Sequence, residues 1–274
     1  MPLSKITFLI NTHSSCSDIW DLISKTTLKY LKDYQVLILS DKKSDYFGDK
    51  EIAIYNPIDD FTTQYEYGLK KIKTKYLITL NDDYILTNKP KVNEIKRLIN
   101  FLEKNNTFKF VRLFKGTLKS YMNIEITKNL YLIDNKVRHL YSQTATLWET
   151  KSLLNLYKIS PRGFIGKRNN LTFAQSKFNI CTEDAIDEIA IKNKLWGLYY
   201  FNGEKKIGHS FHECSILPHL NSIIIGGKLN FIEYEYEIKK IFETLNIKTY
   251  RKFIKHDFKT KIHSLIKKIL SISS

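Results

Sequence analysis

Three consecutive polar residues, Asn81, Asp82 and Asp83, follow the apolar run from Tyr76 to Leu80. An uninterrupted apolar run of this length is typical of a strand buried on both faces of a parallel sheet. In open α/β sheets, ligands bind beyond the carboxyl ends of such strands. Adjacent carboxylates there favour a hard cation, so we expect Mg²⁺ or Mn²⁺ at Asp83, with substrate phosphates completing its shell. The alternative is a plain turn, because Asn and Asp are common turn residues.

A second acidic group, Glu183 and Asp184, opens a predicted helix for which Thr182 is the candidate N-cap. Acidic residues in a first turn are stabilised by the helix dipole, so a structural role alone accounts for them. The functional alternative is that Asp184, or Glu183 as second choice, faces the same crevice as a general base. Asp187 and Glu188 lie one turn further on, where capping does not need them.

Other candidate ligands lie outside these two groups. His209 or His212 could complete the metal shell, although a lone histidine is more often a surface or hydrogen-bonded core residue. Lys228 follows two glycines and could reach a phosphate. The basic segment 161–172, which includes Arg162, reads as a solvated surface loop, with closure over a diphosphate as the alternative.

The pattern of predicted elements indicates an α/β fold with a Rossmann-like, mostly parallel mixed sheet flanked by helices. We assign a nucleotide-binding half to residues 1–105, an acceptor half to residues 106–246 and a basic helical tail to residues 247–274. Predicted strands cover 5–10, 34–39, 51–55, 76–80, 108–114, 130–133 and 196–201. Predicted helices cover 19–31, 61–72, 92–102, 151–156, to which residues 144–148 lead, and a segment from 183.

In this arrangement, several polar side chains follow strand ends and line one crevice. Asp41 could accept hydrogen bonds from a base or ribose, or it could simply begin a surface loop. Gln143 and Trp148 are candidates for the far, acceptor-binding side; the flat face of Trp148 suits stacking on a sugar, although a core role is the commoner one. The candidate nucleotide contacts are Asn11, Thr12, Asp18, Asp41, Asn81, Asp82 and Lys228.

The composition points to an anionic partner and a reducing compartment. The 274 residues carry a formal net charge of +16. The three cysteines are widely spaced, which argues against a disulfide framework or zinc knuckle. The N-terminal apolar run is too short for a signal peptide. We therefore expect a cytoplasmic protein, either soluble or peripheral on the inner face of the cytoplasmic membrane.

Residues 247–274 contain seven Lys and one Arg against one Asp, and their apolar residues recur at spacings of three and four. This pattern predicts a basic amphipathic helix suited to an anionic membrane surface, at about 1 kcal/mol per basic residue. Packing of the apolar stripe onto the domain, or a nucleic-acid-binding face, are the alternatives.

The order of these features resembles bacterial glycosyltransferases with the GT-A fold, in particular inverting enzymes that build surface polysaccharides or lipooligosaccharides. The resemblance covers residues 5–230, and Asn81 stands where the family's DXD motif has its first Asp. The matching features are the turn ending in Ser17-Asp18-Ile19-Trp20, Asp41, the DXD-like run Tyr76 to Asp83, and the acidic pair in Thr182-Glu183-Asp184.

The resemblance implies transfer of a sugar from a nucleotide-diphosphate sugar, with UDP as the expected nucleotide, to a hydroxyl of a glycan or glycolipid. It implies Mn²⁺ or Mg²⁺ at Asp83 and Asp184 as the base for direct displacement with inversion. Two other classes stay open. A nucleotidyl- or phosphotransferase could use the same carboxylates, and a basic nucleic-acid-binding module would lose affinity steeply with salt. We expect no nucleic-acid partner, because no recognition motif is present.

Overall fold

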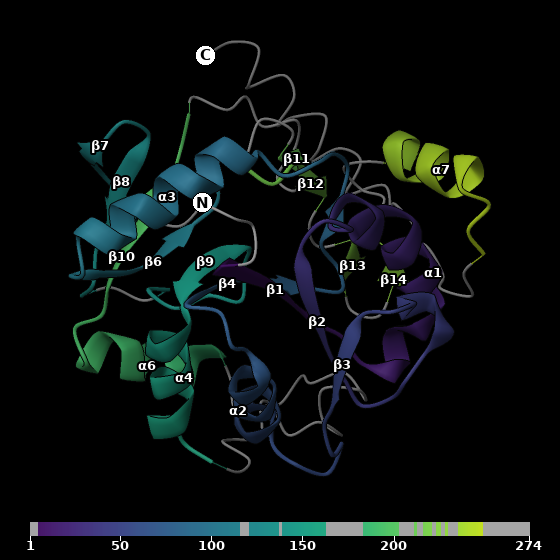
Figure 1. The fold of residues 1–274 in the computed structure, drawn as a ribbon, viewed down its shortest axis with the longest axis horizontal. Coiled ribbons are helices and arrows are strands. Elements are labelled where there is room, and N and C mark those ends of the chain that lie inside the picture. The colour runs from purple at the N-terminus through teal and green to yellow at the C-terminus, as the bar shows by residue number, and fades with distance from the viewer. Residues whose placement is uncertain are drawn as a thin grey trace, which may run out of the picture.

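The structure is a computed structural model that describes residues 5–115, 121–136, 139–162, 183–202, 211–212, 216–220, 223–225, 228–229 and 235–248 (Figure 1). His209, residues 163–172 of the basic loop and the tail from residue 249 lie outside the described residues, so the hypotheses about them stay predictions. Within the described part of the chain, no helix is long and apolar enough to cross a membrane.

A nine-stranded sheet with the order β3-β2-β1-β4-β9-β6-β10-β8-β7 forms the centre of the molecule. Strands β9 and β8 run antiparallel to their neighbours, and the other seven strands point in one direction. The strands are β1 (Ile6–Asn11), β2 (Gln35–Ser40), β3 (Glu51–Ile54), β4 (Tyr76–Asn81), β6 (Phe108–Arg112), β7 (Tyr121–Thr127), β8 (Leu130–Ile133), β9 (Thr146–Glu149) and β10 (Trp196–Tyr200).

Two small sheets accompany the large one. The first has the order β11-β12-β5, and the second is the hairpin β13-β14. Their strands are β5 (Ile85–Leu86), β11 (Phe211–His212), β12 (His219–Leu220), β13 (Ile224–Ile225) and β14 (Lys228–Leu229).

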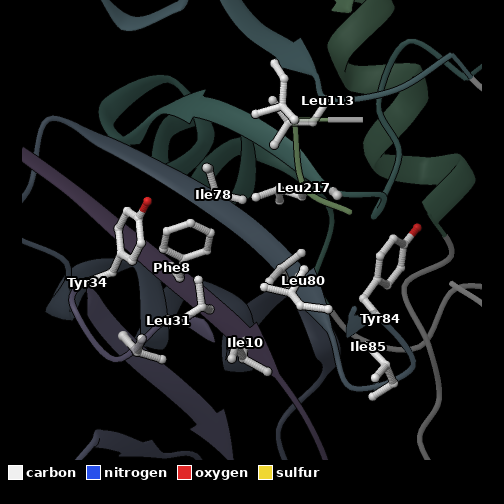
Figure 2. Close-up of a cluster of buried hydrophobic side chains, with 14 of the residues drawn as sticks. Phe8, Ile10, Leu31, Tyr34, Ile78, Leu80, Tyr84, Ile85, Leu113 and Leu217 are labelled. Carbon is white, nitrogen blue, oxygen red and sulfur yellow. The ribbon is translucent and has the colours of Figure 1, made fainter. Parts of the chain in front are cut away.

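Helices cover both faces of the large sheet, because side chains alternate along each strand and both sets are apolar. Leu77 faces a core built with helices α2, α4 and α6, whereas Ile78 and Leu80 face a core built with α1 and α3 (Figures 1 and 2). The helices are α1 (Trp20–Ile23), α2 (Phe61–Lys71), α3 (Val92–Lys104), α4 (Thr150–Ile159), α6 (Glu183–Lys192) and α7 (Glu235–Thr244), with 3₁₀ turns at Ser14–Ile19 and Asp45–Phe47.

This architecture confirms the predicted α/β class with a Rossmann-like, mostly parallel mixed sheet flanked by helices. The predicted helix over 19–31 is wrong in detail: a 3₁₀ turn, the short helix α1 and a π-helical turn, Ser24–Leu28, follow one another. The predicted cap at Ser17 or Asp18 is also wrong, since His13 precedes the 3₁₀ turn and its side chain accepts from the Ser15 N–H.

Candidate functional site

Strands β1 and β4 end level with each other at the carboxyl edge of the sheet. Asn11 pairs with Asn81, and the Asp82 N–H donates to the Asn11 carbonyl at 3.0 Å. The Tyr84 N–H donates to the Asn81 carbonyl at 3.0 Å, so Asn81 to Tyr84 form a tight turn. The predicted turn therefore lies at the carboxyl edge of the sheet, where ligands are expected. The half-buried Asp82 and Asp83 belong to this turn.

A buried threonine orients Asp82. Thr12 is 2% exposed, and its hydroxyl donates to Asp82 Oδ2 at 2.8 Å while accepting from Trp20 Nε1 at 2.8 Å. The Thr12 carbonyl accepts from the Tyr55 hydroxyl at 3.2 Å. Burial, with the nearby charges of Asp41 and Asp82, raises the pKa of Tyr55, which keeps this hydroxyl a neutral donor. The side chain of Thr12 is thus buried and orients the Asp82 carboxylate, and it is not exposed to contact a nucleotide.

Asp41 organises the turn that follows β1. Its carboxylate accepts from the Ser14 N–H at 2.7 Å and from the Ser14 hydroxyl at 2.6 Å, and His13 Nε2 lies 3.3 Å away. The Asp41 side chain is only 10% exposed, so it is not the start of a solvated loop. Asp18 is half-buried in the 3₁₀ turn beyond. A base or ribose contact by Asp41 stays a prediction.

Of the two predicted acceptor-side residues, one lies at this edge and one does not. The Asn81 side-chain amide donates to the Gln143 carbonyl at 3.2 Å, which places Gln143 beside the acidic turn. Trp148 is 1% exposed and stacks on Phe110 with ring centroids 4.4 Å apart. The stacking role for Trp148 is therefore corrected to a core role, because β9 is inserted between β4 and β6 and carries this residue into the middle of the sheet.

The second acidic group, Glu183 and Asp184, opens helix α6. Helix α6 leads into β10, which runs in the same direction as β4. In the short loop between α6 and β10, the Leu195 N–H donates to the Ala190 carbonyl at 3.0 Å. Helix α6 packs on the sheet through buried Ile186 and Ala190. Asp187, in the second turn of α6, bonds the backbone of His139 and Tyr141, near Arg112 at the end of β6. That Glu183 or Asp184 faces the crevice at the carboxyl edge stays a prediction.

Segments after residue 210 return to the acidic turn. The Ile223 N–H donates to the Asp83 carbonyl at 3.4 Å, and Lys228 lies opposite Ile225 in the adjacent hairpin. His212 pairs with His219, which pairs with Leu86 on the other side. The backbone positions of His212 and Lys228 thus lie near the segment that follows Asp83.

His219 is a buried histidine at this edge that the sequence analysis did not single out. Its ring stacks against Tyr84 at 5.3 Å, and its Nδ1 donates to the Leu217 carbonyl. No sequence motif includes His219, and the aromatic rings of Tyr84 and Phe114 that pack against it come from distant parts of the chain.

The donor atoms of the acidic turn are oxygens, which suits a hard cation such as Mn²⁺ or Mg²⁺. Among the described residues, no three His, Cys, Asp or Glu side chains converge in the manner of a complete metal site. The metal site at Asp83, with His209 or His212 as a further ligand, stays a proposal.

Two hollows lie at the opposite, amino edge of the sheet and are not part of this site. One, of about 150 Å³, is lined by residues including Lys75, Glu103 and Glu149. The other, of about 430 Å³, is lined by residues including Gln35 and Lys73. The first contains residues that precede and begin β4, and the second contains residues that begin β2, so both are remote from the carboxyl ends of these strands.

The first residues of the basic loop are anchored to helix α2. The Arg162 guanidinium donates to Glu66 and to the Thr63 hydroxyl, the latter at 3.1 Å, and Lys70 lies 2.7 Å from Glu66. Burial alone would raise the pKa of Glu66, but the hydrogen bonds from Lys70 and Arg162 outweigh it and lower this pKa. Arg162 is therefore bound to the fold and does not belong to a freely solvated loop.

The turn after Asp83 is fixed from the other side by Thr27 of the π-helical turn. The buried Thr27 hydroxyl donates to the Tyr84 carbonyl at 3.3 Å and accepts from the Leu86 N–H at 3.1 Å. The neighbouring Thr26 hydroxyl instead donates to the Leu22 carbonyl of its own helix, at 2.6 Å.

We expect Thr27→Val to lower the free energy of unfolding by about 1–3 kcal/mol, because the buried Leu86 N–H loses its acceptor. The matched variant Thr26→Val removes a hydroxyl bonded only within its own helix, and it should cost less than about 1 kcal/mol. Urea unfolding of both variants measures the difference. Equal losses would show that Thr27 does not anchor the acidic turn.

No family model matches the chain, and no curated protein matches it. Solved structures do. The structure of S. aureus TarS 1-349 in complex with UDP matches at 11% identity and a TM-score of 0.42, over 90% of this chain and 66% of that one. UDP-glucose pyrophosphorylase complexed with UDP-glucose matches at 7% identity and a TM-score of 0.42, over 72% and 90% of the two chains.

In other TarS structures, the match spans 37% of the longer chain and 60% of the 1-349 chain. The synthase of 4-diphosphocytidyl-2C-methyl-D-erythritol from Anaerococcus prevotii matches at 15% identity and a TM-score of 0.39, over 75% and 93%. Likenesses this distant carry no argument about activity, which has to rest on the residues of this chain.

Proposed function

We propose that this protein transfers a sugar from a nucleotide-diphosphate sugar, with UDP as the expected nucleotide, to a hydroxyl of a bacterial surface glycan or glycolipid. Two acidic groups support the proposal: the turn at Asp82 and Asp83, which ends β4, and the pair Glu183 and Asp184, with which helix α6 begins. That the two groups meet across one site is part of the proposal.

On the donor side, Asp83 and the Thr12-bound Asp82 would hold Mn²⁺ or Mg²⁺, which offsets the charge that develops on the departing diphosphate. The same edge offers Asn11 and Asp41 to the nucleoside. Hydrogen bonds from Thr12 and Ser14 hold Asp82 and Asp41 in place before any ligand arrives. Such preorganisation avoids the cost of orienting these carboxylates during the reaction.

On the acceptor side, Asp184 accepts the proton of the acceptor hydroxyl, with Glu183 as second choice. The hydroxyl oxygen then forms a bond to the anomeric carbon while the bond from that carbon to the diphosphate oxygen breaks. A single displacement of this kind inverts the anomeric configuration. It requires a carboxylate within hydrogen-bond reach of the attacking oxygen.

The products distinguish this proposal from its nearest competitor. Incubation with Mn²⁺ and a panel that includes UDP-glucose and UDP-N-acetylglucosamine should release a nucleoside diphosphate. A parallel incubation with UTP and a sugar 1-phosphate tests the competitor. Release of pyrophosphate there, with formation of a UDP-sugar and no release of UDP from UDP-sugars, would contradict sugar transfer and favour a nucleotidyltransferase that uses the same carboxylates.

A further inference from the structure

The backbone segment 139–143, which we call the strut, is bound at its start by helix α6. Asp187 is 4% exposed, and its two carboxylate oxygens accept from the N–H groups of His139 at 2.6 Å and Tyr141 at 2.7 Å. Asp187 lies one helical turn beyond Glu183 and Asp184. Asp187, which helix capping does not explain, therefore uses both carboxylate oxygens to bind the strut.

Two further elements hold the same segment. Arg112, at the end of β6, is 1% exposed and donates through Nη2 to the carbonyls of His139 and Leu140, the latter at 3.0 Å. The Tyr141 hydroxyl shares a hydrogen bond of 2.5 Å with the Tyr157 hydroxyl of helix α4. The strut is thus fixed from the sheet, from α4 and from α6.

These contacts impose an unfavourable conformation on His139. Its φ is 71°, in the left-handed region, which costs a residue other than glycine about 1–2 kcal/mol. Such a conformation persists where the surroundings over-determine it, and it often accompanies functional sites. Here the N–H of His139 is held by Asp187 and its carbonyl by Arg112, while its side chain is exposed.

The far end of the strut reaches the donor side. The Gln143 carbonyl accepts from the side-chain amide of Asn81, the residue directly before Asp82 and Asp83. A continuous connection therefore runs from the first turns of α6 through Asp187, the strut and Asn81 to the acidic turn.

Apolar packing alone does not account for the types of these two residues. Burying a carboxylate and a guanidinium costs desolvation energy, and apolar residues of similar size often give equal or greater stability. Asp187 and Arg112 nevertheless bind the backbone of the same short segment. Their arrangement specifies the geometry of the strut, which apolar packing would define less sharply.

We infer that Asp187 and Arg112 are positioning residues that, through the strut, set the separation between the two acidic groups. The inference rests on the proposed function, because the separation matters only if one group binds the donor and the other activates the acceptor. Misplacement of reacting groups by about 1 Å can cost about a hundredfold in rate. Loosening the strut should therefore reduce turnover and leave nucleotide binding intact.

The test compares Asp187→Asn with Glu188→Gln, a change at an exposed position of the same helix. The asparagine keeps one acceptor oxygen but presents an NH₂ group to the other strut N–H. Two quantities are measured for each: the dissociation constant of UDP with Mn²⁺, and the rate at which UDP-glucose or UDP-N-acetylglucosamine is hydrolysed per nucleotide-binding site. We expect an unchanged dissociation constant and a loss of about tenfold to a hundredfold in turnover for Asp187→Asn, with Glu188→Gln unaffected.

A milder variant, Tyr157→Phe, removes the hydrogen bond between helix α4 and Tyr141 without changing a charge. It should lower turnover severalfold. If Asp187→Asn does not fold, the turnover of Tyr157→Phe tests the inference in its place. Turnover equal to that of Glu188→Gln would overturn the inference. So would a loss of UDP binding equal to the loss of turnover, because that pattern indicates only a structural role. Absence of UDP binding and hydrolysis in the unaltered protein would instead refute the proposed function.

Discussion

The Asp184→Asn variant is expected to bind the nucleotide sugar normally and to lose sugar transfer by about 10²–10⁴-fold, the usual contribution of a general base. The amide is close in size to the carboxylate but cannot accept the acceptor's proton. Asp184 lies in the first turn of helix α6, and Asp187 of the same helix binds the strut that leads to Asn81. The proposed function therefore assigns Asp184 to the acceptor side and not to the donor nucleotide.

The dissociation constant of UDP reports on nucleotide binding, and the rate of UDP release reports on sugar transfer. Measuring both for each variant separates an effect on binding from an effect on transfer. Glu183→Gln is the matched control on the neighbouring residue, and it should change the rate by less than about tenfold. A rate near that of the unaltered protein for Asp184→Asn, with a large loss for Glu183→Gln, would assign the base to Glu183.

Asp83→Asn is expected to lose Mn²⁺-dependent turnover by about 10²–10³-fold, because the metal supplies several kcal/mol of charge stabilisation at the diphosphate. Asp83 directly follows Asp82, which accepts from Thr12, in the turn that ends β4. The Asp83 backbone is fixed by Ile223, which holds the residue on the turn.

Titration of turnover with Mn²⁺ and with a chelator gives the measurement for this variant. The control is Asp49→Asn, whose side chain is 91% exposed and lies by the hollow at the amino edge of the sheet. Asp49→Asn should titrate like the unaltered protein. Turnover that resists the chelator, or an Asp83→Asn variant with the same metal dependence, would contradict a cation at this residue.

The sheet was predictable from sequence where apolar runs and strand ends are local signals. The run from Tyr76 to Leu80 is a central strand because both of its faces are apolar, and both faces are covered by helices. The positions of Asn11, Asp41 and Asp82 followed from the rule that parallel strands end at one edge. Strand β7 was missed, and its side chains Ile124 and Ile126 are exposed, so burial does not shape its pattern.

Contacts between distant segments were not predictable from sequence. The insertion of β9 between β4 and β6 decides that Trp148 is a core residue, and no local pattern encodes that strand order. The bonds of Asp187 to the strut and of Asn81 to Gln143 join residues 46–48 and 62 positions apart. They depend on the register of packed elements, which sequence periodicity does not fix.

The most direct test of the central claim is thermal unfolding with a panel of nucleoside diphosphates, with and without Mn²⁺. A ligand at 100 times its dissociation constant stabilises a folded protein by about 2.7 kcal/mol, which a melting curve shows readily. The proposed function predicts stabilisation by one nucleotide, UDP, that requires Mn²⁺ and disappears in Asp83→Ala. No stabilisation by any nucleotide, or the same stabilisation in Asp83→Ala, would contradict a nucleotide-sugar site at the end of β4.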